Sequence, residues 1–221
     1  VFFTNGSMTQ NSTQGSMTEA PVMNRDTVHK GCFSLWEKLA AKCPEYGHPE
    51  KFAFDPDRSN FVSCSVTVRG YPQFFDYLAE KTGNPTGKGG CSTFVDAPWF
   101  INYNVPLQPV APDQPEDVQF MWFYGLPANN CGTYVKKPMT ECSGEEIMRE
   151  FLYYCGLEDK IDEIMPHITA IPVVMPYITS QFMPRKLKDR PEVIPAGNRN
   201  LTFIGQFVEL EGDVVFTVET S

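Results

Sequence analysis

Two stretches of the sequence combine residue types that could bind a small ligand. In the first, residues 200–206, an apolar strand-like segment ends in Gly205 and a polar side chain, Gln206. A glycine there lets the backbone approach a ligand closely. Gly212 and Asp213 beyond it could open a helix whose N–H groups favour an anionic or electron-rich group. The alternative is an ordinary strand end followed by a turn.

The second stretch, residues 172–185, mixes deformable apolar side chains with hydrogen-bonding ones. The apolar members are Met175, Tyr177, Phe182 and Met183, and the polar members are Thr179, Ser180 and Gln181. This mixture suits a pocket for a long apolar ligand with a polar end. An irregular core segment would have the same composition.

No catalytic or metal-binding pattern accompanies these stretches. The sequence contains no G-x-S-x-G, H-E-x-x-H or G-x-G-x-x-G, and residues 83–90 do not fit a P-loop. The three histidines lack ligand spacing relative to the seven cysteines, so we expect no metal. The cysteines are odd in number and form no C-x-x-C pair, which predicts reduced thiols in a cytoplasmic protein.

The charge balance argues against nucleic acid as a partner, because the 221 residues carry a net charge of −9. Residues 184–190 form the densest basic stretch, which we interpret as a solvated loop or, alternatively, as a contact for an anionic headgroup or phosphate. No apolar run approaches the roughly 20 residues that span a bilayer.

The hydrophobic pattern predicts a mixed architecture of the α/β class with α+β character. Residues 44–60 and 106–116 read as connections, and residues 143–146 as a capping box. Residues 214–218 fit either a strand or a helix. Strands are expected at residues 1–4, 61–69, 91–95, 99–105, 118–124, 171–175 and 201–204, and helices at 33–42, 72–81, 144–154 and 159–165, with the strands of residues 91–124 paired antiparallel.

Five stretches in order along the chain resemble the oleate hydratase (myosin-cross-reactive antigen) family. The chain also opens and closes on apolar runs, which leads us to expect an internal to C-terminal fragment. The matching stretches are VFFTNGSMT (1–9), FYGL (123–126) with YVKKPM (134–139), ECSGEEI (141–147), MPYITSQFMPR (175–185), and NLTFIGQFVE (200–209) with VVFTVE (214–219).

The resemblance implies an FAD-binding lyase that adds water to the cis double bond of an unsaturated fatty acid such as oleate. It implies a Rossmann-type domain, a homodimeric parent protein and peripheral membrane contact. We expect residues 1–30 to end the FAD-binding domain, residues 31–165 to form the sheet and helices of a substrate domain, and residues 166–221 to line the cavity and return to the FAD-binding domain.

The family pattern also assigns site residues by position. The residues expected beside FAD are Asn5, Gly6, Ser7, Met8, Gly205, Gln206, Phe216, Thr217 and Val218. The residues expected to contact the fatty acid are Asn104, Met175, Tyr177, Thr179, Ser180, Phe182 and Met183.

Two departures from the family pattern limit this expectation. The family's glycine fingerprint, catalytic acid and catalytic tyrosine precede the position of Val1, so no catalytic residue is assigned here and we expect the 221 residues alone to be inactive. The family also commonly has histidines where this chain has Leu107 and Val110, in a region associated with the substrate carboxylate. An FAD-dependent oxidoreductase and a non-catalytic flavin- or lipid-binding protein therefore remain alternatives.

Overall fold

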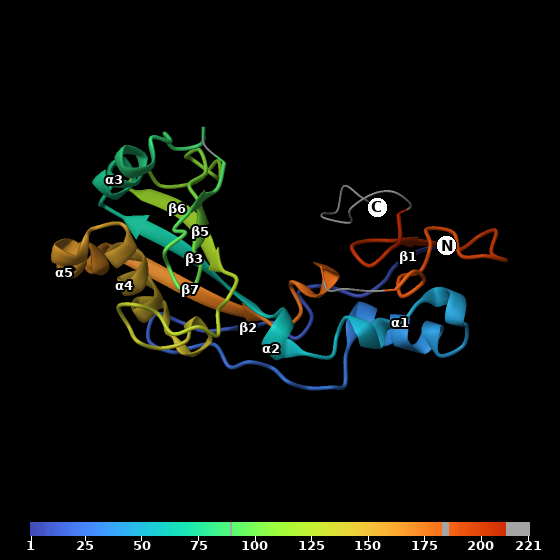
Figure 1. Cartoon of the computed structure of the whole chain (residues 1–221). Coiled ribbons are helices and arrows are strands. Elements are labelled where there is room, and N and C mark those ends of the chain that lie inside the picture. The colour runs from blue at the N-terminus through green and yellow to red at the C-terminus, as the bar shows by residue number, and fades with distance from the viewer. Residues whose placement is uncertain (89, 183–185, 211–221) are drawn as a thin grey trace. The chain divides into compact units, whose positions relative to one another are not determined.

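The computed structural model describes residues 1–88, 90–182 and 186–210, which form two compact units (Figure 1). The first unit contains residues 1–12 and 24–60 and the described residues from 175 onward. The second contains residues 13–23 and 61–174. The chain passes between the units several times, so each is assembled from segments distant in sequence. Residues 31–60 pack in the first unit.

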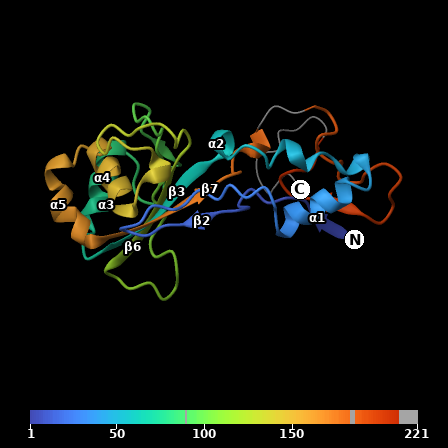
Figure 2. The ribbon, with the colours of Figure 1, turned by 90° about the horizontal axis from the view of Figure 1, so that it is seen from below.

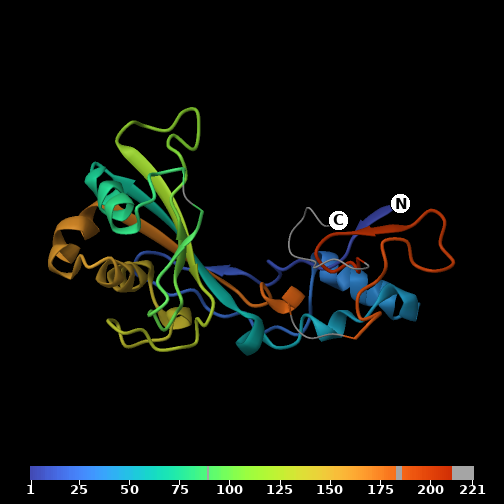
Figure 3. The same cartoon turned by 45° about the horizontal axis from the view of Figure 1, so that its top comes forward.

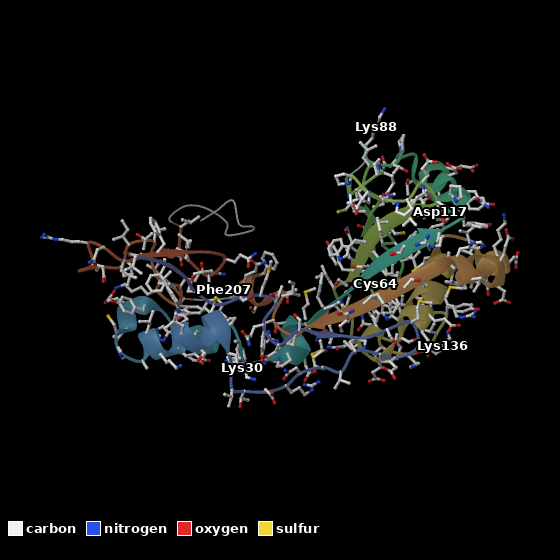
Figure 4. The ribbon with its side chains drawn as sticks, turned by 180° about the vertical axis from the view of Figure 1, so that it is seen from behind. Lys30, Cys64, Lys88, Asp117, Lys136 and Phe207 are labelled. Atoms are coloured by element: carbon white, nitrogen blue, oxygen red, sulfur yellow. The ribbon has the colours of Figure 1, made fainter. Side chains whose placement is uncertain are left out.

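The first unit is built on a two-stranded parallel sheet, β1 with β8. Its core is an aromatic cluster in which Trp36 of α1 stacks on Phe52, with ring centroids 5.7 Å apart. Phe207 packs against both rings and is labelled in Figure 4. The elements are β1 (Phe2–Thr4), α1 (Gly31–Ala40), α2 (Pro56–Ser59) and β8 (Thr202–Ile204), with 3-10 turns at Pro44–Tyr46, Pro49–Lys51 and Ser180–Phe182.

Residues 44–60 are more ordered than the predicted connection. They hold the two 3-10 turns and α2, and each of these begins with a proline. Proline presets the φ angle of a first helical position, where its missing N–H costs nothing. Asp55 caps α2 by accepting a hydrogen bond from the Arg58 N–H at 3.3 Å. Single turns are too short to show hydrophobic periodicity, so the sequence pattern missed them.

The second unit is a six-stranded sheet in the order β2-β7-β3-β6-β5-β4, with helices against one face (Figures 2 and 3). The neighbours β2–β7, β3–β6, β6–β5 and β5–β4 pair antiparallel, which confirms the pairing predicted for residues 91–124. The elements are β2 (Thr13–Gln14), β3 (Phe61–Arg69), α3 (Gln73–Thr82), β4 (Ser92–Thr93), β5 (Asn102–Asn104), β6 (Val118–Gly125), α4 (Gly144–Tyr154), α5 (Ile161–Ile164) and β7 (Ile168–Met175), with 3-10 turns at Met139–Glu141, Glu158–Lys160 and Met165–His167.

Alternation along β3 and β6 directs one set of side chains to the helices, because successive strand residues point to opposite faces. Cys64 lies on the covered face of β3 (Figure 4), opposite Phe123 of β6. The Phe123 ring stacks on Phe151 of α4, with centroids 4.7 Å apart. Cys64 is fully buried in the core of this unit, and this burial raises the pKa of its thiol well above the ordinary value.

The capping box of α4 is confirmed. The Ser143 hydroxyl accepts the Glu146 N–H at 3.3 Å, and the Glu146 carboxylate accepts the Ser143 N–H at 3.0 Å. Gly156 ends the segment with φ +73°. The local sequence therefore sets both ends of this helix.

Candidate functional site

The carboxyl ends of β1 and β8 bring two predicted ligand segments together. Thr4 lies opposite Ile204 in the parallel register, so Asn5 and Gly205 leave the sheet at the same edge. The Asn5 Nδ2 group donates a hydrogen bond to the Phe207 carbonyl oxygen at 2.9 Å, which fixes one segment to the other. In open α/β sheets, ligands bind at this edge of parallel strands.

Two glycines lie at this edge, each with a backbone conformation that favours glycine. Gly6 has φ +67°, and a Cβ atom there would lie 2.8 Å from Phe207 Cδ2 and 3.2 Å from Phe33 Cζ. Gly205 has φ +115°, and its Cβ would lie 3.4 Å from Thr4 Cγ2. Since L-residues rarely adopt these angles, both positions require glycine. At Gly6 the Phe207 and Phe33 rings fill the space that a side chain would take, whereas the backbone at Gly205 has no neighbour closer than 3.4 Å to its Cβ position.

Asn5 supplies a hydrogen-bond acceptor at the edge. Its side chain is 1% exposed, and its Oδ1 atom accepts no hydrogen bond from any residue that the structure describes. Gln181 is similar: its Nε2 group contacts Met8 Sδ at 3.6 Å, while its buried Oε1 has no such partner. Buried polar atoms without partners are uncommon, and a bound ligand is one reason for them. Both oxygens would accept hydrogen bonds from a ligand.

Arg190 links the two predicted ligand segments through hydrogen bonds, and the sequence pattern did not identify it as a site residue. Its guanidinium donates to the Gln206 carbonyl oxygen at 2.5 Å and also to the Gln181 carbonyl oxygen. It lies over the Phe52 ring, 4.9 Å from the centroid, and the residue is 2% exposed. The interpretation of residues 184–190 as a solvated loop is therefore wrong for Arg190. A run of basic residues does not reveal which one turns inward.

Tyr177 and Ser180, two residues of the predicted fatty-acid set, are buried in the first unit. The Tyr177 ring packs beside His29 and Phe33, and burial raises the pKa of its hydroxyl, although a hydrogen bond from Asn11 opposes this. The Ser180 hydroxyl donates to the Tyr177 carbonyl oxygen at 2.8 Å. In this arrangement both side chains hold the segment in place.

The other described members of the segment present surface. Phe182 is about half exposed, and Met175 and Thr179 are partly exposed. The Thr179 N–H bonds to the Ser59 carbonyl oxygen at 3.1 Å, which anchors the segment to the end of α2. An apolar ligand would have to meet this exposed set. Met183 and residues Phe216, Thr217 and Val218 lie outside the described residues.

Asn104 belongs to the second unit. It lies on β5 opposite Trp122 of β6, on the sheet face away from α3 and α4. Trp122 and Tyr124 stand on that face with centroids 5.1 Å apart, and Phe61 lies 4.9 Å from Tyr124. Asn104 is thus a polar group beside an aromatic row.

The loop with the altered family positions is held by glutamine side chains. The Gln108 Nε2 group donates a hydrogen bond to the Phe120 carbonyl oxygen at 2.8 Å, and Gln108 Oε1 accepts one from the Phe120 N–H at 3.2 Å. These bonds form at a part of β6 that no longer pairs with β5. Leu107 is 69% exposed and Val110 is 55% exposed. Their side chains are therefore available to a ligand or solvent.

Within the described part of the chain, no helix is long and apolar enough to cross a membrane. Among the same residues, no three His, Cys, Asp or Glu side chains gather in a way that could hold a metal ion.

Comparison with known proteins decides the family. The model of the MCRA family matches residues 1–221. The chain belongs to the MCRA family. It is 42% identical over 231 residues to an oleate hydratase of Streptococcus pyogenes serotype M49 (strain NZ131), covering 100% of this chain and 39% of the relative. It is 29% identical over 238 residues to a linoleate hydratase of Lactiplantibacillus plantarum, covering 100% of this chain and 41% of that relative. The chain therefore spans about two fifths of the length of these relatives.

Proposed function

We propose that the whole protein carrying this chain is a fatty acid hydratase that adds water to the cis double bond of an unsaturated fatty acid. The observation that carries the proposal is the match of the full chain to the MCRA family, whose relatives include an oleate hydratase and a linoleate hydratase. Hydration needs a general acid that protonates the alkene and a group that activates water. We assign neither role to this chain, because the resemblance places both in earlier family segments.

We further propose FAD as the cofactor, held at the β1–β8 edge. The partly exposed backbone at Gly205 and the acceptor oxygens of Asn5 and Gln181 fit a flat group with hydrogen-bond donors, and Gly6 lets the Phe207 and Phe33 rings pack beneath this edge. Ser7, Met8 and Gln206 lie beside them in sequence. Hydration has no net redox change, so the flavin would contribute structurally or electrostatically. Residues 216–218 would approach its ring system.

The fatty acid would contact the exposed members of residues 175–183. Met175 and Phe182 offer apolar surface and Thr179 offers a hydroxyl. In the second unit, taken by itself, the family pattern proposes Asn104 as a polar contact. Tyr177 and Ser180 would set the backbone path of the segment.

Product analysis tests the function. The whole protein is incubated with oleate and FAD, and the products are measured by mass spectrometry. A gain of one water supports the proposal, whereas a change of two hydrogens would favour the oxidoreductase alternative. Binding of FAD and oleate without any product would favour a non-catalytic binding protein.

A further inference from the structure

His29 immediately precedes Lys30, which Figure 4 labels near the start of α1, and its side chain is 5% exposed. Its Nδ1 atom lies 2.5 Å from Oε1 of Glu37, whose side chain is 39% exposed. The imidazole packs on Phe33 and on Tyr177, with centroid distances of 5.5 and 5.6 Å. The pair thus connects the surface of α1 with the aromatic interior of the first unit.

The second ring nitrogen is the unusual feature. Nε2 of His29 is buried and has no hydrogen-bond partner among the described residues. A buried polar group that lacks a hydrogen-bond partner destabilises the fold. A carboxylate at Nδ1 favours the tautomer with the proton on Nδ1, which leaves the lone pair of Nε2 as an acceptor. Glu37 therefore orients His29 so that an acceptor faces the interior.

The chain contains a second pair of the same chemistry without this feature. His48 Nδ1 lies 3.1 Å from Glu50 Oε1, and the two side chains are 45% and 62% exposed. Water can satisfy every polar atom of that pair. The burial of Nε2, and not the presence of a histidine–glutamate pair, distinguishes His29.

The surroundings of His29 connect it to the candidate ligand edge. Phe33, which contacts the imidazole, is the ring whose Cζ atom would lie 3.2 Å from a Cβ at Gly6. Tyr177 belongs to the segment assigned to the fatty acid. His29 thus contacts the segment assigned to the fatty acid directly, through Tyr177, and is separated by one ring, Phe33, from Gly6 in the segment assigned to FAD.

We propose that His29, oriented by Glu37, is a ligand-binding residue whose Nε2 accepts a hydrogen bond from an O–H group. The ligand class rests on the proposed function. The proposed function offers two sources of such an O–H group: a ribityl hydroxyl of FAD, and the hydroxyl of the hydroxy fatty acid product. His29 acts as the acceptor, and Glu37 is the positioning residue that fixes its tautomer.

Nitrogen-15 NMR of histidine in the whole protein tests the tautomer directly. We expect His29 to carry its proton on Nδ1, and its Nε2 resonance to move when the correct ligand is added. FAD and the hydroxy fatty acid are titrated separately, so the responding ligand identifies the source. A proton on Nε2, or a resonance that neither ligand moves, overturns the proposal.

Variants separate binding from folding. His29→Phe removes the acceptor but keeps an aromatic ring, and we expect about tenfold weaker binding of the responding ligand, equivalent to about 1.4 kcal/mol. The melting temperature should change little, because the variant removes both the unpaired Nε2 and the Nδ1 bond to the partly exposed Glu37. His29→Gln, which retains an acceptor, should restore part of the affinity. His48→Phe is the matched control and should change neither quantity.

Glu37→Gln tests the positioning role through a spectroscopic readout. It should shift the His29 tautomer population and weaken the same ligand, whereas Glu50→Gln should leave both unchanged. A lower melting temperature for His29→Phe with unchanged affinity would show a purely structural histidine and refute the inference, while hydration of oleate by the same protein would leave the proposed function standing. If the unmodified protein binds neither ligand, the proposed function fails and the inference falls with it.

Discussion

The fully buried Glu150 side chain on α4 holds a loop of the second unit through three backbone hydrogen bonds. Its carboxyl oxygens accept the N–H groups of Thr133, Tyr134 and Val135 at 2.6, 2.8 and 2.9 Å. In Glu150→Gln, the amide oxygen can replace Oε2, which accepts two of these bonds, but the NH2 group then faces the Thr133 N–H. Losing a hydrogen bond to a charged group costs about 1.5–3 kcal/mol, and an unsatisfied buried donor costs about 1–3 kcal/mol. We expect a loss of about 2–4 kcal/mol, because these two costs overlap.

Hydrogen exchange measured by mass spectrometry or NMR is the appropriate assay, because the change is local. A loss of about 2–4 kcal/mol corresponds to exchange of the Thr133 amide that is faster by about 30- to 1000-fold. Glu145→Gln on the same helix is the control. The Glu145 carboxylate accepts a hydrogen bond from Arg149 at 2.9 Å in a partly exposed surface pair, and surface pairs contribute about 0–1 kcal/mol. If Glu150→Gln exchanges no faster than this control, the three bonds do not hold the loop and the reasoning is refuted.

Three further predictions concern the candidate edge, the cysteines and the altered loop. Gly6→Ala should lower both the melting temperature and the FAD affinity more than Gly83→Ala does. Both glycines have φ near +67°, but an added Cβ meets a ring at 2.8 Å at Gly6 and nothing within 4 Å at Gly83. Equal losses in the two variants would contradict a crowding effect. Burial raises the pKa of Cys142 to about 12, so iodoacetamide at pH 8 should alkylate the exposed Cys91 and spare Cys142, as peptide mass spectrometry would show. Below a pH of about 8.5, the ordinary pKa of an unfolded thiol, Cys142 is protonated in both the folded and the unfolded state. As the pH rises from there toward about 12, the unfolded thiol loses its proton first, so the free energy of unfolding falls. Leu107→His should change the free energy of unfolding by less than about 0.5 kcal/mol, because the residue is exposed. At acidic pH the new histidine is positively charged and should tighten the binding of the fatty acid carboxylate, as measured by calorimetry. Unchanged affinity would argue against a head-group contact there.

The sequence by itself determined the features that depend on neighbouring residues. The alternation along residues 61–69 and 118–124 was confirmed as β3 and β6, and the capping box at Ser143 was confirmed at the start of α4. The same holds for the family, because its motifs are written in contiguous residues and the family model matches the whole chain. Local propensity and side-chain period are properties of the sequence alone.

The tertiary structure decided which distant residues meet. β1 pairs with β8 across about 200 positions of sequence, and only that register brings Asn5 to Phe207. The inward turn of Arg190 depends on carbonyl groups at Gln181 and Gln206 that exist in position only after folding. A buried charge is tolerated where backbone groups satisfy its donors, and no local pattern specifies those groups. The composition of the candidate site is therefore readable from the sequence, while its geometry comes from contacts between segments that the chain separates.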